Sequence, residues 1–146
     1  MTETVTATLR VRIGQKDAHY GGNLVDGACI LRLFGDVVTE ITIQTDGDEG
    51  LLTGYSEVEF TAPVYAGDYI EVTGRLVGRS RLRRTVEFTA RKCIAARYDL
   101  GATRAEVLDE PVLVCRAVGT AVIPRAAARR RSAGSGAPHV GLPGEE

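Results

Sequence analysis

The stretch Asn23–Ile43, NLVDGACILRLFGDVVTEITI, decides how this chain folds. Its apolar residues recur at helical spacing and form one broad face: Leu24, Ala28, Leu31, Phe34, Val38 and Ile41. Further apolar residues, Val25, Leu33 and Val37, extend this character around most of the circumference, which is typical of a buried helix. A single polar stripe, Arg32, Asp36 and Glu40, interrupts the pattern at i, i+4 and i+8.

Strand patterns lie on both sides of this helix. Val5–Ile13 alternates apolar and polar residues, which predicts a half-buried strand. After the turn residues Asp46–Gly50, four further strands are predicted at Leu51–Phe60, Tyr69–Val77, Leu82–Tyr98 and Val112–Ile123. Gly78–Ser80 predicts a hairpin turn, and Asp99–Glu110 is interpreted as a polar excursion from the sheet.

The order of one strand, one helix and four strands predicts an α+β fold with a five-stranded antiparallel sheet. One helix cannot cover both faces of such a sheet, so we expect the remaining apolar surface to join subunits of a homo-oligomer. Residues 1–123 are predicted to form a single domain. Residues 124–146 are rich in Ala, Arg, Gly and Pro without periodicity, which predicts a disordered C-terminal tail.

The composition is that of an ordinary globular protein, with a net charge of −1 over 146 residues. Nothing in this charge demands a nucleic-acid partner. Cys29, Cys93 and Cys115 have no CxxC or metal-ligand spacing, which favours free thiols in a reducing compartment. The N-terminus lacks a signal-peptide pattern, and no apolar stretch is long enough to cross a bilayer. We therefore expect a cytoplasmic protein without a membrane partner.

The segment before the helix, Asp17–Asn23 (DAHYGGN), concentrates groups that suit chemistry. It combines an acid, an imidazole, a phenol and two glycines. Free backbone N–H groups at a helix start can hold a developing oxyanion, so such groups suit a catalytic site. The alternative is a capped helix start with a flexible loop before it.

Several of these runs resemble one enzyme family. Asp17–Tyr20, Gly22–Val25, Phe34–Val37, Glu59–Asp68 and the final strand from Pro111 to Gly119 are similar to the 3-aminoacyl-CoA ammonia-lyases of amino-acid fermentation. The resemblance implies a hotdog fold, in which a curved five-stranded antiparallel sheet wraps a long central helix. It also implies reversible elimination of ammonia from 3-aminobutyryl-CoA or β-alanyl-CoA to give a 2-enoyl-CoA.

Such an elimination needs a base within reach of the α-proton, donors for the enolate oxygen and a carboxylate for the ammonium group. With the resemblance, we expect four catalytic residues: Asp17, His19, Glu59 and Asp36. We expect the substrate to contact Tyr20, Gly21, Gly22 and Asn23. No motif for a metal or an organic cofactor is found, so we expect none beyond the coenzyme A that belongs to the substrate.

Each of these residues also has a structural interpretation. Asp17 suits an Asx-turn cap, and His19 suits a loop histidine bonded to backbone. Glu59 suits a solvated strand position, and Asp36 suits an ion pair with Arg32. The β-alanyl-CoA branch of the family has asparagine at the place of Asp26, so that residue is expected to tune the site rather than act as base.

A basic turn lies far along the chain from these groups. It carries Arg79, Arg81, Arg83 and Arg84. Arginine forks suit phosphate, so we expect this turn to bind the phosphates of coenzyme A. The alternative is a solvated sheet edge that prevents aggregation. Because the turn is distant in sequence from His19, we expect active sites shared between subunits of a homodimer or larger assembly.

Three other functions stay open on the sequence. A related lyase would hydrate an enoyl-CoA, with water in place of ammonia. An acyl-CoA thioesterase on the same fold would use a carboxylate such as Asp17 against the thioester. A non-catalytic protein of this fold would bind acyl-CoA without turning it over.

Overall fold

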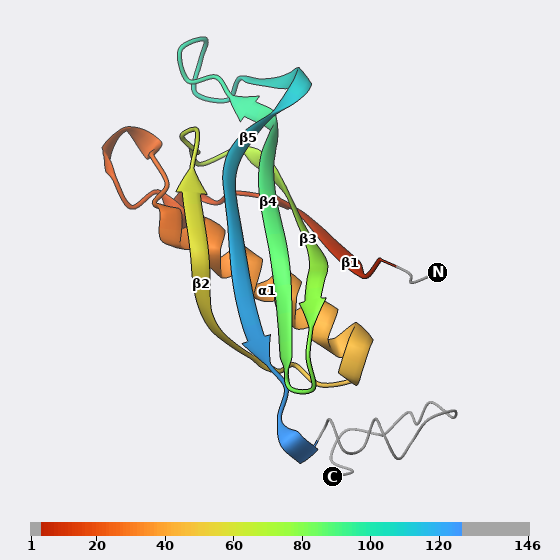
Figure 1. Cartoon of the computed structure of the whole chain (residues 1–146). Helices are drawn as coiled ribbons and strands as arrows, with labels where there is room; N and C mark the ends of the chain where they lie inside the picture. Colours follow the sequence, from red (N-terminus) through yellow and green to blue (C-terminus); the bar gives the residue numbers. More distant parts are fainter. Residues whose placement is uncertain (1–3, 127–146) are drawn as a thin grey trace, which may run out of the picture.

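Within residues 4–126, the part of the chain that the computed structural model describes, one long helix lies along a five-stranded antiparallel sheet (Figure 1). The elements in chain order are β1 (Thr6–Arg12), α1 (Gly27–Asp46), β2 (Leu51–Phe60), β3 (Tyr69–Arg79), β4 (Arg83–Ala96) and β5 (Ala105–Val122). The strand order across the sheet is β1-β3-β4-β5-β2. The predicted α+β fold of one helix and five antiparallel strands is confirmed. The tail predicted from residue 124 lies, except for residues 124–126, outside the described residues.

The apolar face of α1 forms the core together with the inner face of the sheet. Ile30, Phe34, Val37, Val38 and Ile41 are buried on this helix face. The ring of Phe34 stacks on that of Phe88 in β4, with 4.8 Å between the ring centroids. Each large apolar side chain buried in this way contributes roughly 1.5–3 kcal/mol. The spacing of the apolar residues therefore determines which helix face turns to the sheet.

The helix limits and its exposure differ from the prediction. Val25 does not begin the helix because its N–H donates to the carbonyl of Val64 at 2.9 Å, which keeps the chain extended up to Asp26. The helix continues to Asp46 and ends at Gly47, whose left-handed conformation (φ 66°) suits a glycine. It is not buried on all sides: Arg32, Asp36 and Glu40 are exposed, because one sheet covers one face only.

The strand limits also differ at the two ends of β4. The β3–β4 turn lies at residues 80–82 rather than at Gly78–Ser80. β5 begins at Ala105, within the predicted polar excursion, and its first residues pair with the end of β4, as Ile94 does with Val107. This extension is largely exposed on both faces, so it lacks the alternating burial that marks a strand in a sequence.

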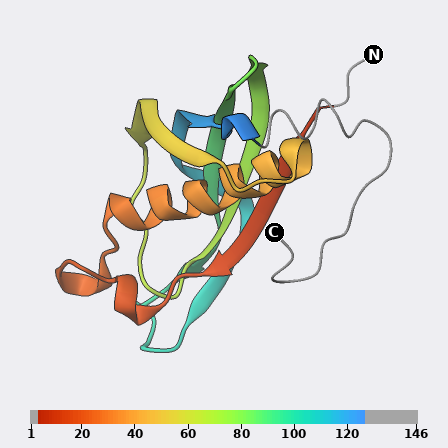
Figure 2. The ribbon, with the colours of Figure 1, turned by 90° about the horizontal axis from the view of Figure 1, so that it is seen from below.

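The two edges of the sheet are β1 and β2, and α1 lies between them in the view of Figure 2. β2 has no second neighbour among the described strands, and it carries the exposed apolar side chains of Val58 and Phe60. Residues 4–126 contain no helix that could span a membrane.

Candidate active site

The segment before α1 forms two tight turns, Gln15–Asp17 and Gly21–Asn23. Gly22 and Asn23 both have left-handed backbones, with φ of 67° and 66°. The amide Oδ1 of Asn23 accepts a hydrogen bond from Gln15 Nε2 at 2.8 Å, and its carbonyl accepts one from the N–H of Ala66 at 2.9 Å. These bonds hold the predicted substrate-binding residues in one compact loop.

Asp17 is tied to α1 by an ion pair. Arg32 Nη2 donates to Asp17 Oδ1 at 3.2 Å, and the Asp17 side chain is 19 % exposed. The same guanidinium lies 3.6 Å from the sulfur of Cys29, whose pKa is raised by burial. The suggested ion pair between Arg32 and Asp36 is not formed among the described residues, because Arg32 pairs with Asp17 instead.

His19 and Tyr20 stand exposed beside this pair. Their rings meet edge to face, with 5.2 Å between the centroids. The backbone N–H of His19 donates to the carbonyl of Asp17 at 2.9 Å, so a tight turn joins the two residues. The structure thus brings Asp17, His19 and Tyr20 together with the glycine turn, as the sequence predicts.

The position of the helix start changes which amides can serve as oxyanion donors. Because α1 begins at Gly27, its free N–H groups are those of Gly27 and Ala28, not those of residues 21–23, whereas the N–H of Cys29 donates to the carbonyl of Asp26 at 3.3 Å. The N-cap residue Asp26 makes no capping hydrogen bond with its side chain. Among the described residues, the N–H groups of Gly27 and Ala28 therefore remain available to a ligand.

Gly27 and Phe60 are in a close contact that the sequence pattern does not predict. A Cβ atom at Gly27 would lie 2.5 Å from Cζ of Phe60, so the ring packs directly on the first helical turn. The ring is 54 % exposed. The end of the edge strand β2 therefore lies beside the N-terminus of α1, which is called the helix mouth below. A glycine that begins a helix is the local signal for such a close approach.

Asp68, a second residue that the sequence pattern does not mark as part of the site, holds the neighbouring loop. Its side chain is fully buried and accepts hydrogen bonds from the N–H groups of Tyr65 and Ala96, at 2.8 and 2.7 Å. Lys92 Nζ forms an ion pair with it at 2.9 Å. Through Val64 and Ala66 this loop supports residues 23–25.

Glu59 lies on the opposite face of the sheet from α1. Its neighbours Val58 and Phe60 pair with the buried residues Ala117 and Cys115, whereas Glu59 pairs with the exposed Arg116. Arg116 Nε donates to Glu59 Oε1 at 3.0 Å. A groove of about 770 Å³ on this face is lined by, among others, Ser56, Glu57, Glu59, Glu87, Thr89, Arg116 and Val118. Within one chain, Glu59 therefore does not meet Asp17 and His19.

Asp36 also stands apart from the loop, on the exposed face of α1. It makes no ion pair among the described residues. Glu40, one turn later, accepts a hydrogen bond from Gln44. The four predicted catalytic residues thus do not form one cluster in a single chain.

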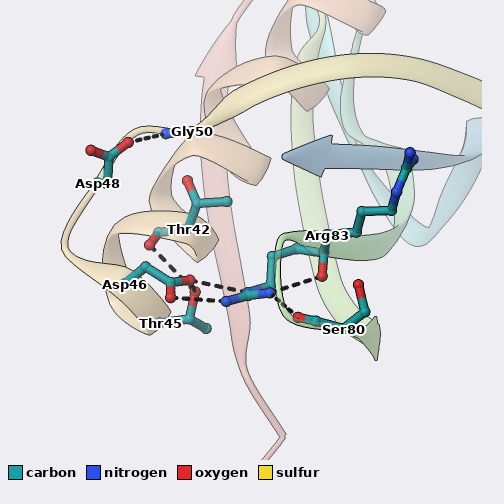
Figure 3. A network of polar contacts seen from close by, with 8 residues as sticks. Thr42, Thr45, Asp46, Asp48, Gly50, Ser80 and Arg83 are labelled. Carbon is teal, nitrogen blue, oxygen red and sulfur yellow. Dashed lines mark hydrogen bonds and ion pairs between the residues drawn. The ribbon is translucent and has the colours of Figure 1, made fainter. Parts of the chain in front are cut away.

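The basic turn lies near the other end of α1. Arg79, Arg81 and Arg83 are exposed. Arg84 is buried and pairs with Asp46 at 2.9 Å, so its expected contact with phosphate is corrected to a structural ion pair (Figure 3). Because Asp46 and Arg32 are about 20 Å apart along the helix axis, the basic turn and Asp17 occupy opposite ends of the molecule. Residues 4–126 contain no group of three His, Cys, Asp or Glu side chains that could hold a metal ion.

The chain is 52 % identical over 119 residues to a 3-aminobutyryl-CoA ammonia lyase of Acetoanaerobium sticklandii. The match covers 82 % of this chain and 94 % of that protein. No family model matches the sequence.

Two solved structures place the fold among known proteins. The β-alanyl-CoA:ammonia lyase of Clostridium propionicum superposes with a TM-score of 0.80 at 38 % identity, covering 84 % of this chain and 87 % of that one. A hexameric hotdog-fold thioesterase of Campylobacter jejuni reaches a TM-score of 0.66 at 17 % identity, covering 81 % and 83 %. At this identity the second likeness shows a shared hotdog fold alone.

Proposed function

The chain belongs to the 3-aminoacyl-CoA ammonia-lyase family, and we propose that it catalyses the reversible elimination of ammonia from a 3-aminoacyl-CoA. The product is a 2-enoyl-CoA, and the substrates of this class are 3-aminobutyryl-CoA and β-alanyl-CoA. The observation that carries the proposal is the identity with a 3-aminobutyryl-CoA ammonia lyase over nearly the whole length of that relative. The cluster of acid, imidazole and phenol at the helix mouth supports it.

The proposed reaction begins with proton transfer at the helix mouth. Asp17 binds Arg32 through Oδ1, and among the described residues no hydrogen bond involves its Oδ2. We propose that this free oxygen removes the α-proton of the substrate. His19 donates a hydrogen bond to the thioester carbonyl. The amides of Gly27 and Ala28 support the enolate oxygen. The electron pair of the enolate then forms the Cα–Cβ double bond while the C–N bond of the β-ammonium group breaks, and the nitrogen leaves with that bonding pair as neutral ammonia. Asp17 finally releases the α-proton to solvent.

We propose that a neighbouring subunit completes the site. The unpaired edge β2 and its exposed Val58 and Phe60 suit a contact between copies of the chain. Glu59 lies at this edge and Asp36 on the exposed face of α1. We propose that one of these carboxylates approaches the ammonium group in the site of another subunit. We propose that a neighbouring subunit also supplies its basic turn to the site, because the basic turn of the same chain lies at the far end of α1 from Asp17.

Coenzyme A is proposed to bind this turn through its phosphates. Arg79, Arg81 and Arg83 are exposed and have no ion-pair partner among the described residues, so their guanidinium groups are free for phosphate. The proposed elimination uses no metal and no further cofactor. A cytoplasmic location is proposed because the thiols of Cys29, Cys93 and Cys115 are free.

The test is to mix the purified protein with crotonyl-CoA and ammonium and to follow the enoyl absorbance. Loss of this absorbance without release of free thiol supports the lyase. Release of free thiol instead identifies a thioesterase. Binding of crotonyl-CoA with neither change identifies a non-catalytic acyl-CoA-binding protein. The comparison of crotonyl-CoA with acrylyl-CoA then separates the 3-aminobutyryl from the β-alanyl substrate.

A further inference from the structure

The buried ion pair at the end of α1 is bonded to the backbone of the basic turn. Arg84 donates to Asp46 through Nε at 3.0 Å and through Nη2 at 2.9 Å. Its Nη1 donates to the carbonyls of Ser80 at 2.6 Å and of Arg83 at 2.9 Å. Figure 3 shows Asp46 facing this turn, while the side chain of Arg83 points away from it. One guanidinium thus joins the helix end to both ends of the turn.

Asp46 is itself fixed in place. Thr45 Oγ1 donates to its Oδ2 at 2.6 Å, and the Asp46 and Arg84 side chains are only 1 % and 4 % exposed. The turn has two more anchors: the N–H of Ser80 donates to the carbonyl of Arg83, and that of Ile123 to the carbonyl of Leu82. A buried arginine of this kind holds its neighbours in one geometry, because its loss would take a donor from the carbonyl of Ser80 and leave Asp46 without its counter-charge.

The charges of the turn divide into two groups. The charge of Arg84 is balanced by Asp46. Arg79, Arg81 and Arg83 keep exposed charges on the same short segment. We propose that Arg84 is a positioning residue for the phosphates of coenzyme A, acting through the turn backbone without touching the phosphates. The inference rests on the proposed binding of coenzyme A by the other three arginines.

The geometry requires an arginine at this position. Four of the hydrogen bonds above come from one planar guanidinium, which has five N–H donors in a fixed fork. A lysine ammonium keeps the charge but has three donors at a single point, so it cannot reach Asp46 and both carbonyls together. Arg84→Lys therefore separates the effect of geometry from that of charge.

The experiment compares Arg84→Lys with Arg81→Ala and Arg83→Ala. Calorimetry measures the Kd of coenzyme A, and kinetics with ammonium measure kcat and KM for crotonyl-CoA and crotonyl-pantetheine. We expect Arg81→Ala and Arg83→Ala to weaken coenzyme A binding about tenfold, as loss of one charged hydrogen bond does. Arg84→Lys should raise the Kd and the KM for crotonyl-CoA about three- to tenfold, with kcat and the KM for crotonyl-pantetheine nearly unchanged. Arg10→Lys, at an exposed position of β1, is the matched control.

The outcomes separate the two proposals. If Arg81→Ala and Arg83→Ala weaken coenzyme A binding but Arg84→Lys does not, the positioning role is overturned. If none of the variants changes the Kd, the phosphate assignment fails together with the inference. A wild-type protein that binds coenzyme A without turnover contradicts the lyase alone, since the calorimetry still tests Arg84. If Arg84→Lys lowers kcat for both thioesters equally and lowers the melting temperature, the residue serves stability only.

Discussion

The carboxylate of Asp17 and the guanidinium of Arg32 form an ion pair with an Oδ1–Nη2 distance of 3.2 Å. This pair binds the loop before the helix to the second turn of α1. It also leaves Asp36, one turn further along, without Arg32 as its partner. Arg32, on the exposed face of the helix, therefore pairs with a carboxylate of the preceding loop and not with a carboxylate of the helix itself.

Asp17→Asn should lower turnover by roughly two to four orders of magnitude, the usual contribution of a positioned acid or base. The amide keeps the size of the side chain but cannot accept a proton. The measurement is kcat for ammonia addition to crotonyl-CoA. Asp26→Asn is the matched control, because the side chain of this N-cap makes no capping bond, so activity should persist. An inactive Asp36→Asn protein beside an active Asp17→Asn protein would move the base onto α1.

At a crotonyl-CoA concentration far below the KM of the arginine variant, mixed oligomers should recover activity that both parent variants largely lack. The change pairs His19→Ala in one chain with an Arg81→Ala/Arg83→Ala double variant in the other. If a site combines the loop of one subunit with the basic turn of another, mixed assemblies contain some intact sites. Activity is measured after the two proteins are unfolded and refolded together. Continued inactivity, with subunit exchange shown by mass spectrometry, would place each site within one chain.

Asp46→Asn should destabilise the protein by about 3–5 kcal/mol, because it leaves Arg84 buried without its counter-charge. Burial alone would raise the pKa of the Asp46 carboxyl, but hydrogen bonds from Arg84 and Thr45 bring it below its usual value. This stabilisation is complete above the unfolded pKa of about 3.9 and is lost as the pH falls through the lower folded value.

The difference in urea midpoint between wild type and Asp46→Asn should therefore be constant near neutral pH and shrink below about pH 4. Both proteins are measured at the same concentration, since subunit association adds to stability. Asp99→Asn removes an exposed ion pair with Arg97 and should leave the midpoint unchanged. A difference that grows on acidification would contradict this explanation.

Gly27→Ala should destabilise the protein by about 1–3 kcal/mol, because the new methyl group overlaps the ring of Phe60. Phe60→Ala should remove most of this cost, which a double-mutant cycle on the unfolding free energy measures. Gly35→Ala on the same helix is the control: its Cβ meets no atom within 4 Å, so it should stabilise the helix by up to about 1 kcal/mol. Equal effects at both glycines would exclude the close contact as the cause.

The thiols should react with iodoacetamide in the order of their exposure. Burial raises the pKa of Cys115 to about 11 and that of Cys29 above its usual value, so little thiolate is present at pH 8. Cys93 is partly exposed and should be alkylated first. Peptide mapping by mass spectrometry measures the order, and the difference should disappear in urea. Rapid labelling of Cys115 in the folded protein would contradict its burial.

The sequence by itself determined the elements and their order. The helical spacing of Phe34, Val38 and Ile41 marks the buried face of α1, and the alternation in residues 5–13 marks β1. These patterns follow from the periods of the helix and the strand, which are properties of the local backbone. The cluster of Asp17, His19 and Tyr20 was also visible, because its members are close neighbours in the chain.

Only the tertiary structure decided the contacts between distant segments. The carbonyl of Val64 binds the N–H of Val25 and keeps this residue out of the helix. Asp46 forms an ion pair with Arg84, which is therefore buried, unlike the other arginines of the turn. Arg32 forms its ion pair with Asp17 and not with Asp36. Each of these outcomes depends on which of several chemically equal partners comes within hydrogen-bond reach after the chain has packed. Local periodicity carries no information on that choice, because it is made by the packing of α1 and the strands against one another.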